Sequence, residues 1–187
     1  GINHPLALEL WQTGLAEARI LAGMTADPRQ LTPEQADAWV QDLDSWDVCD
    51  QLCMNLLERV PYRVEKIDRW AAQDEEFVRR AAFALIACLA WHDRQAPDNF
   101  FTGLFPLIEQ AAADQRNYVR KAVSWALRNI GKRNRYLNEQ AVQLAEQIGQ
   151  QETRSARWIA ADVLRELQDE KTRARLQKRS SAEPNPG

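Results

Sequence analysis

The chain has 187 residues, of which 45% are hydrophobic and 27% are charged, a composition typical of globular rather than disordered proteins. No apolar run reaches about 18 residues and no signal peptide is visible, so we expect neither a transmembrane helix nor secretion. Three cysteines and two histidines argue against a disulfide framework and against a structural metal site. They fit a reducing cytoplasm, where we expect the protein to act.

The formal net charge of −3 conceals an uneven distribution of charge along the chain. Residues 1–76 have a net charge of −9, and residues 77–187 a net charge of +6. No acidic residue lies between Asp114 and Glu139, whereas seven basic residues do. This basic segment predicts either a phosphate-binding surface or a solvated helix flank.

Helical periodicity recurs along the chain, with proline or glycine near most breaks, and no segment shows the alternation of a strand. The first helices of the predicted pairs lie near residues 5–12, 33–43, 62–73, 98–113 and 135–148. The second helices lie near residues 14–25, 45–59, 75–91, 116–131 and 152–168. Thr32 and Pro33 predict a capped helix start. We expect one repeat domain over 1–170 and a polar, flexible tail over 171–187.

The predicted second helices share one sequence pattern. Matching segments are Glu17–Ala22, Phe77–Ala82, Tyr118–Val123 and Ser155–Ala160. The last three start 41 and then 37 residues apart, and Asp47–Leu52 fits the same frame with acidic residues in place of basic ones. A period of about 40 residues with two helices per unit is typical of a HEAT-like repeat. The sequence therefore predicts an all-α, HEAT-like α-solenoid of about five helix pairs.

Equivalent positions in successive repeats of a solenoid lie along one face, usually the concave one. Here these positions are occupied by Asp50, Arg80, Lys121 and Trp158. Trp46 lies one helical turn before Asp50, and Trp125 lies one turn after Lys121. A carboxylate, indoles and cations on one surface indicate chemistry on nucleic acid, in a basic concave groove.

Asp50 has other interpretations when it is considered alone. It is either a solvated acid or an ion-pair partner of Arg80, and such a partner would lower its pKa. The apolar stripe that contains Ala81 and Leu85 predicts the buried face of its helix, and Arg80 lies one position off that stripe.

Most of the seven tryptophans are expected to pack between helices. We assign this role to Trp11, Trp39, Trp70 and Trp91. Trp158 fits either packing or function.

In order along the chain, several segments resemble the AlkD-type DNA alkylation repair glycosylases. They are Ser45–Asp50, Val78–Ala82, Val119–Arg128 and Ala156–Ala160. The resemblance implies a HEAT-like solenoid that binds duplex DNA and excises positively charged N3- and N7-alkylpurines. It implies Asp50 as the catalytic carboxylate, Trp46 and Trp125 as indoles around the lesion, and Arg80 beside it.

The remaining basic residues are expected to bind the DNA backbone. The resemblance assigns a phosphate to Arg128, and the basic character of the surface extends this role to Arg79, Arg120, Lys121, Lys132 and Arg133. Family members usually begin with a further helical segment, whereas this chain starts within the repeat array. Its motif also reads Trp-Asp-Val-Cys-Asp-Gln instead of the double-tryptophan form.

These observations predict a monomeric, monofunctional DNA glycosylase whose substrate is duplex DNA carrying alkylated bases. No lysine stands out as a Schiff-base nucleophile, and we expect no cofactor, metal or membrane partner. The alternative is a non-catalytic HEAT-like scaffold that binds DNA or protein.

Overall fold

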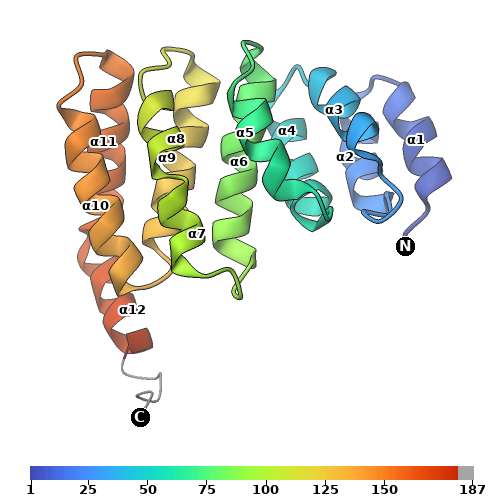
Figure 1. The fold of residues 1–187 in the computed structure, drawn as a ribbon. Helices are drawn as coiled ribbons and strands as arrows, with labels where there is room; N and C mark the ends of the chain where they lie inside the picture. Colours follow the sequence, from blue (N-terminus) through green and yellow to red (C-terminus); the bar gives the residue numbers. More distant parts are fainter. Residues whose placement is uncertain (181–187) are drawn as a thin grey trace. The chain divides into compact units, whose positions relative to one another are not determined.

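A computed structural model describes residues 1–180 of the chain, and these residues contain helices but no strand. The chain divides into two compact units, the first formed by Gly1–Cys88 and the second beginning at Leu89. Within each unit, consecutive helices pair and lie side by side (Figure 1). The prediction of an all-α, HEAT-like repeat fold is confirmed.

The first unit contains the first three predicted helix pairs. They are α1 (His4–Gln12), α2 (Ala16–Thr25), α3 (Pro33–Gln41), α4 (Trp46–Asn55), the short 3-10 helix η1 (Leu57–Arg59), α5 (Arg63–Ala71) and most of α6 (Glu76–His92). The predicted helix 45–59 is interrupted because Leu56 leaves helical geometry, with φ −131° and ψ −59°. The predicted start at Thr32 is confirmed, because its hydroxyl accepts from the Gln35 amide at 3.2 Å.

The second unit contains the remaining pairs and one further helix. They are α7 (Asp98–Gly103), α8 (Phe105–Ala111), α9 (Asn117–Gly131), α10 (Arg135–Gly149), α11 (Arg154–Leu167) and α12 (Glu170–Ser180). The predicted helix 98–113 is divided at Leu104, and Pro106, which has no amide hydrogen to donate, lies in the first turn of α8. Most of the segment predicted as a flexible tail, 171–187, belongs to α12. Its remainder, 181–187, lies outside the described residues.

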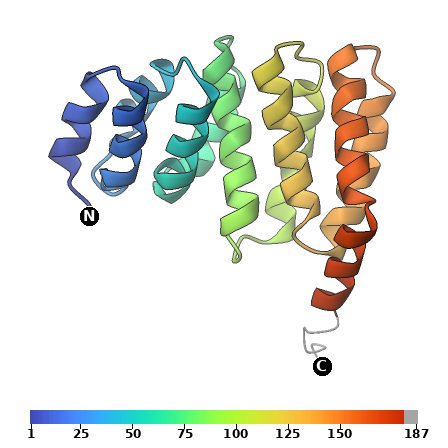
Figure 2. The same cartoon turned by 180° about the vertical axis from the view of Figure 1, so that it is seen from behind.

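Small side chains allow the helices to approach closely. Ala81, Ala82 and Ala84 on α6, and Ala122 on α9, are fully buried. In the second unit, a Cβ on Gly131 would collide with the Leu167 side chain, so α9 and α11 meet where a side chain is missing. Figure 2 shows these two helices side by side from behind.

Three of the four tryptophans assigned to packing are buried. Trp11 and Trp39 stack with their ring centroids 4.2 Å apart, and the Trp70 indole donates to Asp37 at 2.9 Å. The assignment of Trp91 is wrong, because its side chain is 65% exposed near the end of α6. The Lys132 ammonium lies 6.0 Å from the centroid of that ring. Among the described residues, no helix combines the length and the apolar character required to cross a membrane.

Candidate functional site

The Asp50 carboxylate and the Arg80 guanidinium form a two-point ion pair between α4 and α6 in the first unit. Arg80 Nε donates to Asp50 Oδ1 at 3.1 Å, and Arg80 Nη2 donates to Asp50 Oδ2 at 2.7 Å. Arg80 is only 5% exposed, so it is buried although it lies off the apolar stripe of α6. A planar guanidinium that binds both carboxylate oxygens fixes the orientation of the carboxylate.

The pKa of Asp50 is raised, because burial of the carboxyl outweighs the attraction and the hydrogen bonds of Arg80. The nearby Asp47 charge also raises it. The pairing with Arg80 was one of the two interpretations of the sequence, but the expected lowering of the pKa is wrong. The physical reason is that desolvation opposes the ionised form more strongly than one cation favours it.

Trp46, in contrast, opens to solvent one turn before Asp50 on α4. Its side chain is 52% exposed, and residues four apart on a helix lie on one face. Asp47 is exposed beside it, and its pKa is lowered by the Ser45 hydroxyl and by the Val48 amide, which donates to Asp47 Oδ1 at 2.9 Å. The start of α4 therefore presents an exposed indole on the same helical face as the half-buried Asp50 carboxylate.

Arg79, the neighbour of Arg80 on α6, contributes to the fold of the first unit. Its Nε donates to the carbonyl oxygen of Ala71, at the end of α5, at 2.8 Å. A guanidinium used in this way satisfies a carbonyl left free at a helix end. Arg79 is half-buried, and this contact ties it to the helix pair.

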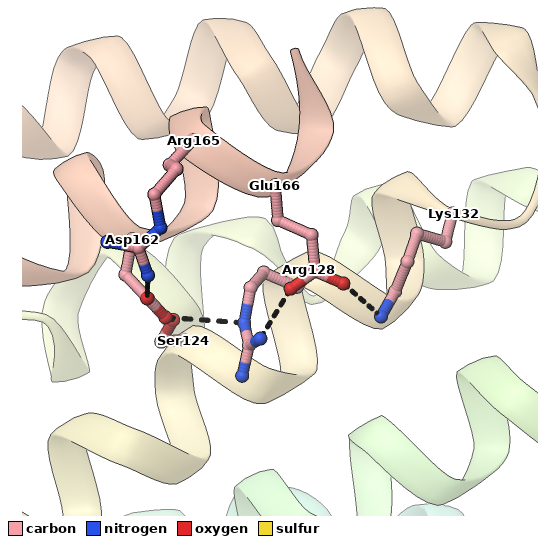
Figure 3. A network of polar contacts seen from close by, with 6 residues as sticks. All are labelled: Ser124, Arg128, Lys132, Asp162, Arg165 and Glu166. Atoms are coloured by element: carbon pink, nitrogen blue, oxygen red, sulfur yellow. Dashed lines mark hydrogen bonds and ion pairs between the residues drawn. The ribbon is translucent and has the colours of Figure 1, made fainter. Parts of the chain in front are cut away.

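In the second unit, a glutamate joins two of the predicted DNA-binding cations. Glu166 Oε2 accepts from Arg128 Nη1, and Glu166 Oε1 accepts from Lys132 Nζ at 2.7 Å (Figure 3). Burial raises the pKa of Glu166, but the hydrogen bonds and charges of Lys132 and Arg128 outweigh this effect, so the pKa is lowered.

Asp162, one turn before Glu166 on α11, completes this network. Ser124 Oγ donates to Asp162 Oδ2 at 2.7 Å, and Arg165 pairs with the other carboxylate oxygen. Arg128 Nε lies 3.4 Å from Asp162 Oδ2. Figure 3 shows the Arg128 guanidinium between the two carboxylates. Sequence analysis missed Ser124, Asp162 and Glu166, although Ser124–Asp162 and Arg128–Glu166 are each separated by 38 residues, close to one repeat.

Three other residues of the predicted site lie on α9, the helix that carries Arg128. Arg120 stacks on the Trp158 ring at 4.9 Å from its centroid, and its Nη2 donates to Asn117 at 3.1 Å. Lys121 is exposed, and Trp125 is half-buried. Trp158 therefore supports Arg120, whereas Lys121 remains accessible to an anion.

Both Nη atoms of Arg133 donate to nearby backbone carbonyls. Its Nη1 donates to the carbonyl oxygens of Ala90 and Asp93 at 2.9 and 2.8 Å, and its Nη2 donates to Ala96 at 3.1 Å. The guanidinium also lies 4.2 Å from the Phe101 ring centroid, and burial lowers its pKa. These contacts assign Arg133 to the end of α6, and we do not include it in a DNA-binding surface.

The predicted residues thus form two groups, one in each unit. The first contains Trp46, Asp50, Arg79 and Arg80; the second contains Arg120, Lys121, Trp125, Arg128, Lys132 and Arg133. Cys49, Cys53 and Cys88 are buried free thiols; the hydrogen bond with Cys49 and burial raise the pKa of Cys53, and burial raises the pKa of Cys88. Within residues 1–180, no group of three His, Cys, Asp or Glu side chains is arranged to hold a metal ion.

A comparison with one solved structure agrees with this fold. A solved structure described as "a new family of proteins related to the HEAT-like repeat DNA glycosylases with affinity for branched DNA structures" matches with a TM-score of 0.72 and 21% identity. The match covers 94% of this chain and 76% of that chain. A designed armadillo repeat protein in complex with the peptide (KR)4 matches with a TM-score of 0.46 and 12% identity, over 94% of this chain and 74% of its own.

The sequence comparisons place the chain more narrowly. No curated protein sequence matched it. The family described as "DNA alkylation repair enzyme" matches residues 2–147, which is most of the chain and includes both the Asp50–Arg80 pair and Arg128. The chain therefore belongs to the DNA alkylation repair enzyme family.

Proposed function

We propose that this protein is a monofunctional DNA glycosylase that removes positively charged N3- and N7-alkylpurines from duplex DNA. The observation that carries the proposal is the half-buried Asp50 carboxylate, which is oriented by Arg80 and lies one turn from the exposed Trp46. A fixed carboxylate beside an accessible indole suits a substrate that develops positive charge.

The reaction needs no general acid. An alkylated purine already carries a positive charge, so the glycosidic electron pair leaves with the base and neutralises it. The sugar becomes oxocarbenium-like, and water supplies the oxygen that bonds to C1′ while its proton passes to solvent. In this mechanism Asp50 stabilises the developing positive charge on the sugar and orients the water, as a carboxylate does in glycoside hydrolysis.

Arg80 acts through Asp50 in this proposal. Burial raises the pKa of Asp50, and the Arg80 guanidinium opposes that effect, which favours the ionised carboxylate. Trp46 contributes the face of an indole to the charged base, an interaction of roughly 0.5–2 kcal/mol. Selectivity for charged over neutral bases then comes partly from the indole and partly from the lability of the lesion itself.

The cations of the second unit hold the DNA backbone. Lys121 is exposed, and Arg128, Lys132 and Arg120 are half-buried on or next to α9. Contacts between such side chains and phosphates carry little sequence information and weaken as salt concentration rises. We therefore propose that this protein binds duplex DNA independently of sequence and with a strong salt dependence.

A non-catalytic DNA-binding protein is the second candidate. Both oxygens of Asp50 are occupied by Arg80, which partly neutralises the charge that catalysis would use. The solved structure of similar fold is described as having affinity for branched DNA structures. A binder would hold such DNA with the same cations and release no base.

Release of alkylpurine from methylated duplex DNA tests the proposal. Asp50→Asn should lower release by roughly 100-fold or more, because the carboxylate is replaced by a neutral group of the same shape. Asp47→Asn is the matched control, since it removes the exposed carboxylate three positions away, and it should leave release within about threefold of wild type. Equal release by wild type and Asp50→Asn would eliminate Asp50 as the catalytic group. Binding without release by wild type would favour the second candidate.

Trp46→Ala tests the contact with the lesion. We expect kcat/KM for a cationic alkylpurine to fall by roughly 3- to 30-fold, which corresponds to the loss of one cation–π contact. The free energy of unfolding should change little, because about half of the indole surface is already exposed. Tyr136→Ala, on a ring of similar exposure (51%) in the second unit that has no assigned role, is the control and should retain activity.

A further inference from the structure

We propose that Arg128 and Lys132 form a phosphodiester-binding subsite, and that the Glu166 carboxylate occupies this subsite in the free protein and is displaced by DNA. The inference rests on the proposed function for DNA as the ligand. It adds a residue, Glu166, that limits the affinity of the protein for DNA.

The geometry of Glu166 is that of an anion between two cations. Its two oxygens are bound separately, one by Arg128 Nη1 and one by Lys132 Nζ at 2.7 Å (Figure 3). A phosphodiester also presents two anionic oxygens, and arginine and lysine are common partners of phosphate in proteins. The carboxylate therefore marks the position that a backbone phosphate would take.

The two carboxylates of this network differ in how easily they can leave. The Asp162 side chain is 12% exposed and is held by Ser124 and by Arg165 as well as by Arg128. The Glu166 side chain is 32% exposed, and its longer stem allows it to turn toward solvent. Asp162 therefore positions the Arg128 guanidinium, whereas Glu166 competes with the phosphate for it.

Breaking the Glu166 ion pairs is expected to cost little free energy. Ion pairs that are partly exposed contribute little to stability, because water solvates the separated partners. A phosphate of a polyanion gains additionally from the release of counterions, which Glu166 cannot provide. Displacement is thus favoured at low salt, and removal of the Glu166 charge should make DNA binding tighter.

Glu166→Gln tests the subsite through affinity for undamaged duplex DNA, measured by fluorescence anisotropy at low salt. We expect Kd to fall by roughly 3- to 10-fold, because both cations lose their internal competitor. Glu139→Gln removes the same charge from an exposed pair with Arg135 in the same unit, and it should change Kd by less than about twofold. Thermal unfolding of each variant checks that its fold is intact.

A double-mutant cycle assigns the effect to these contacts. In a protein that carries Arg128→Ala and Lys132→Ala, Glu166→Gln should no longer tighten binding. The inference is overturned if Glu166→Gln binds no more tightly than Glu139→Gln, or if it tightens binding equally without the two cations. It is also overturned if none of these proteins binds DNA. Absence of base release with tighter binding by Glu166→Gln would reject only the glycosylase activity and leave the subsite standing.

Discussion

Both units hold an arginine–carboxylate ion pair, but the pKa values of the two carboxyls shift in opposite directions. In the first unit, Asp50 is paired with the buried Arg80, and burial raises the pKa of its carboxyl. In the second, Glu166 bridges Arg128 and Lys132, and these cations lower the pKa of its carboxyl despite burial. The number of cations and the access of water, rather than the presence of a salt bridge, decide the direction of the pKa shift.

The comparison also separates two uses of charge. A buried pair keeps its partners together, because either charge left alone in the protein interior is costly. A partly exposed pair exchanges partners easily, because water solvates the separated groups. We therefore propose that the pair in the first unit orients a catalytic carboxylate, and that the pair in the second exchanges with DNA phosphate.

The largest effect is expected from Arg80→Met. This change leaves the Asp50 carboxylate without the guanidinium that binds both its oxygens, and we expect the free energy of unfolding to fall by about 2–4 kcal/mol at neutral pH. Urea unfolding followed by circular dichroism measures it. The loss should be smaller near pH 3, where Asp50 is protonated, and a loss independent of pH would contradict a role through this carboxylate.

The pH dependence of catalysis gives a second test of the Asp50–Arg80 pair. Release of alkylpurine should fall as pH falls through the raised pKa of Asp50. Arg80→Gln removes a cation that lowers this pKa, so the acid limb of the kcat/KM profile should move to higher pH. An acid limb that moved to lower pH, or stayed in place, would show that Arg80 does not act on the ionisation of Asp50.

Stability should depend on pH in opposite directions for the two carboxylates. Asp50 has a raised folded-state pKa, so its contribution to stability is present below its unfolded-state pKa and is lost as pH rises through the folded-state pKa. Glu166 has a lowered folded-state pKa, so its contribution is present above its unfolded-state pKa and is lost as pH falls.

Unfolding of wild type, Asp50→Asn and Glu166→Gln between about pH 3 and about pH 6 measures this difference. As pH rises, the stability of wild type relative to Asp50→Asn should decrease, whereas its stability relative to Glu166→Gln should increase. If both stability differences changed with pH in the same direction, the proposed contrast between the two carboxylates would be wrong.

The smallest effect concerns an ion pair whose two side chains are both more than half exposed. Arg135 and Glu139 form an i,i+4 ion pair at the start of α10 with side chains 73% and 56% exposed. Glu139→Gln should change the free energy of unfolding by about 0.5 kcal/mol or less, whereas Glu166→Gln should cost about 0.5–1.5 kcal/mol because it breaks two less exposed pairs. Equal losses would indicate that the Glu166 network contributes no more than a surface pair.

The basic segment of the sequence shows how far linear reasoning extends. Residues 115–138 contain no acid, yet Arg128 and Lys132 find Glu166 on another helix, and Arg116 pairs with Asp114 at 2.5 Å. A segment that lacks acidic residues can therefore still be neutralised by acidic residues from other segments. Trp91 shows the same limit, because hydrophobicity alone does not reveal whether a neighbouring helix covers a side chain.

The sequence by itself determined most of the helices, their pairing into repeats and the placement of Trp46 and Asp50 on one helical face, because these follow from local periodicity and spacing. Only the tertiary structure decided that Arg80 binds both oxygens of Asp50, that burial outweighs this cation, and that Arg133 serves the end of α6. It also decided that Glu166 binds both Arg128 and Lys132. The physical reason is that solvation and charge pairing depend on which side chains meet across helices, and sequence spacing alone does not specify those neighbours.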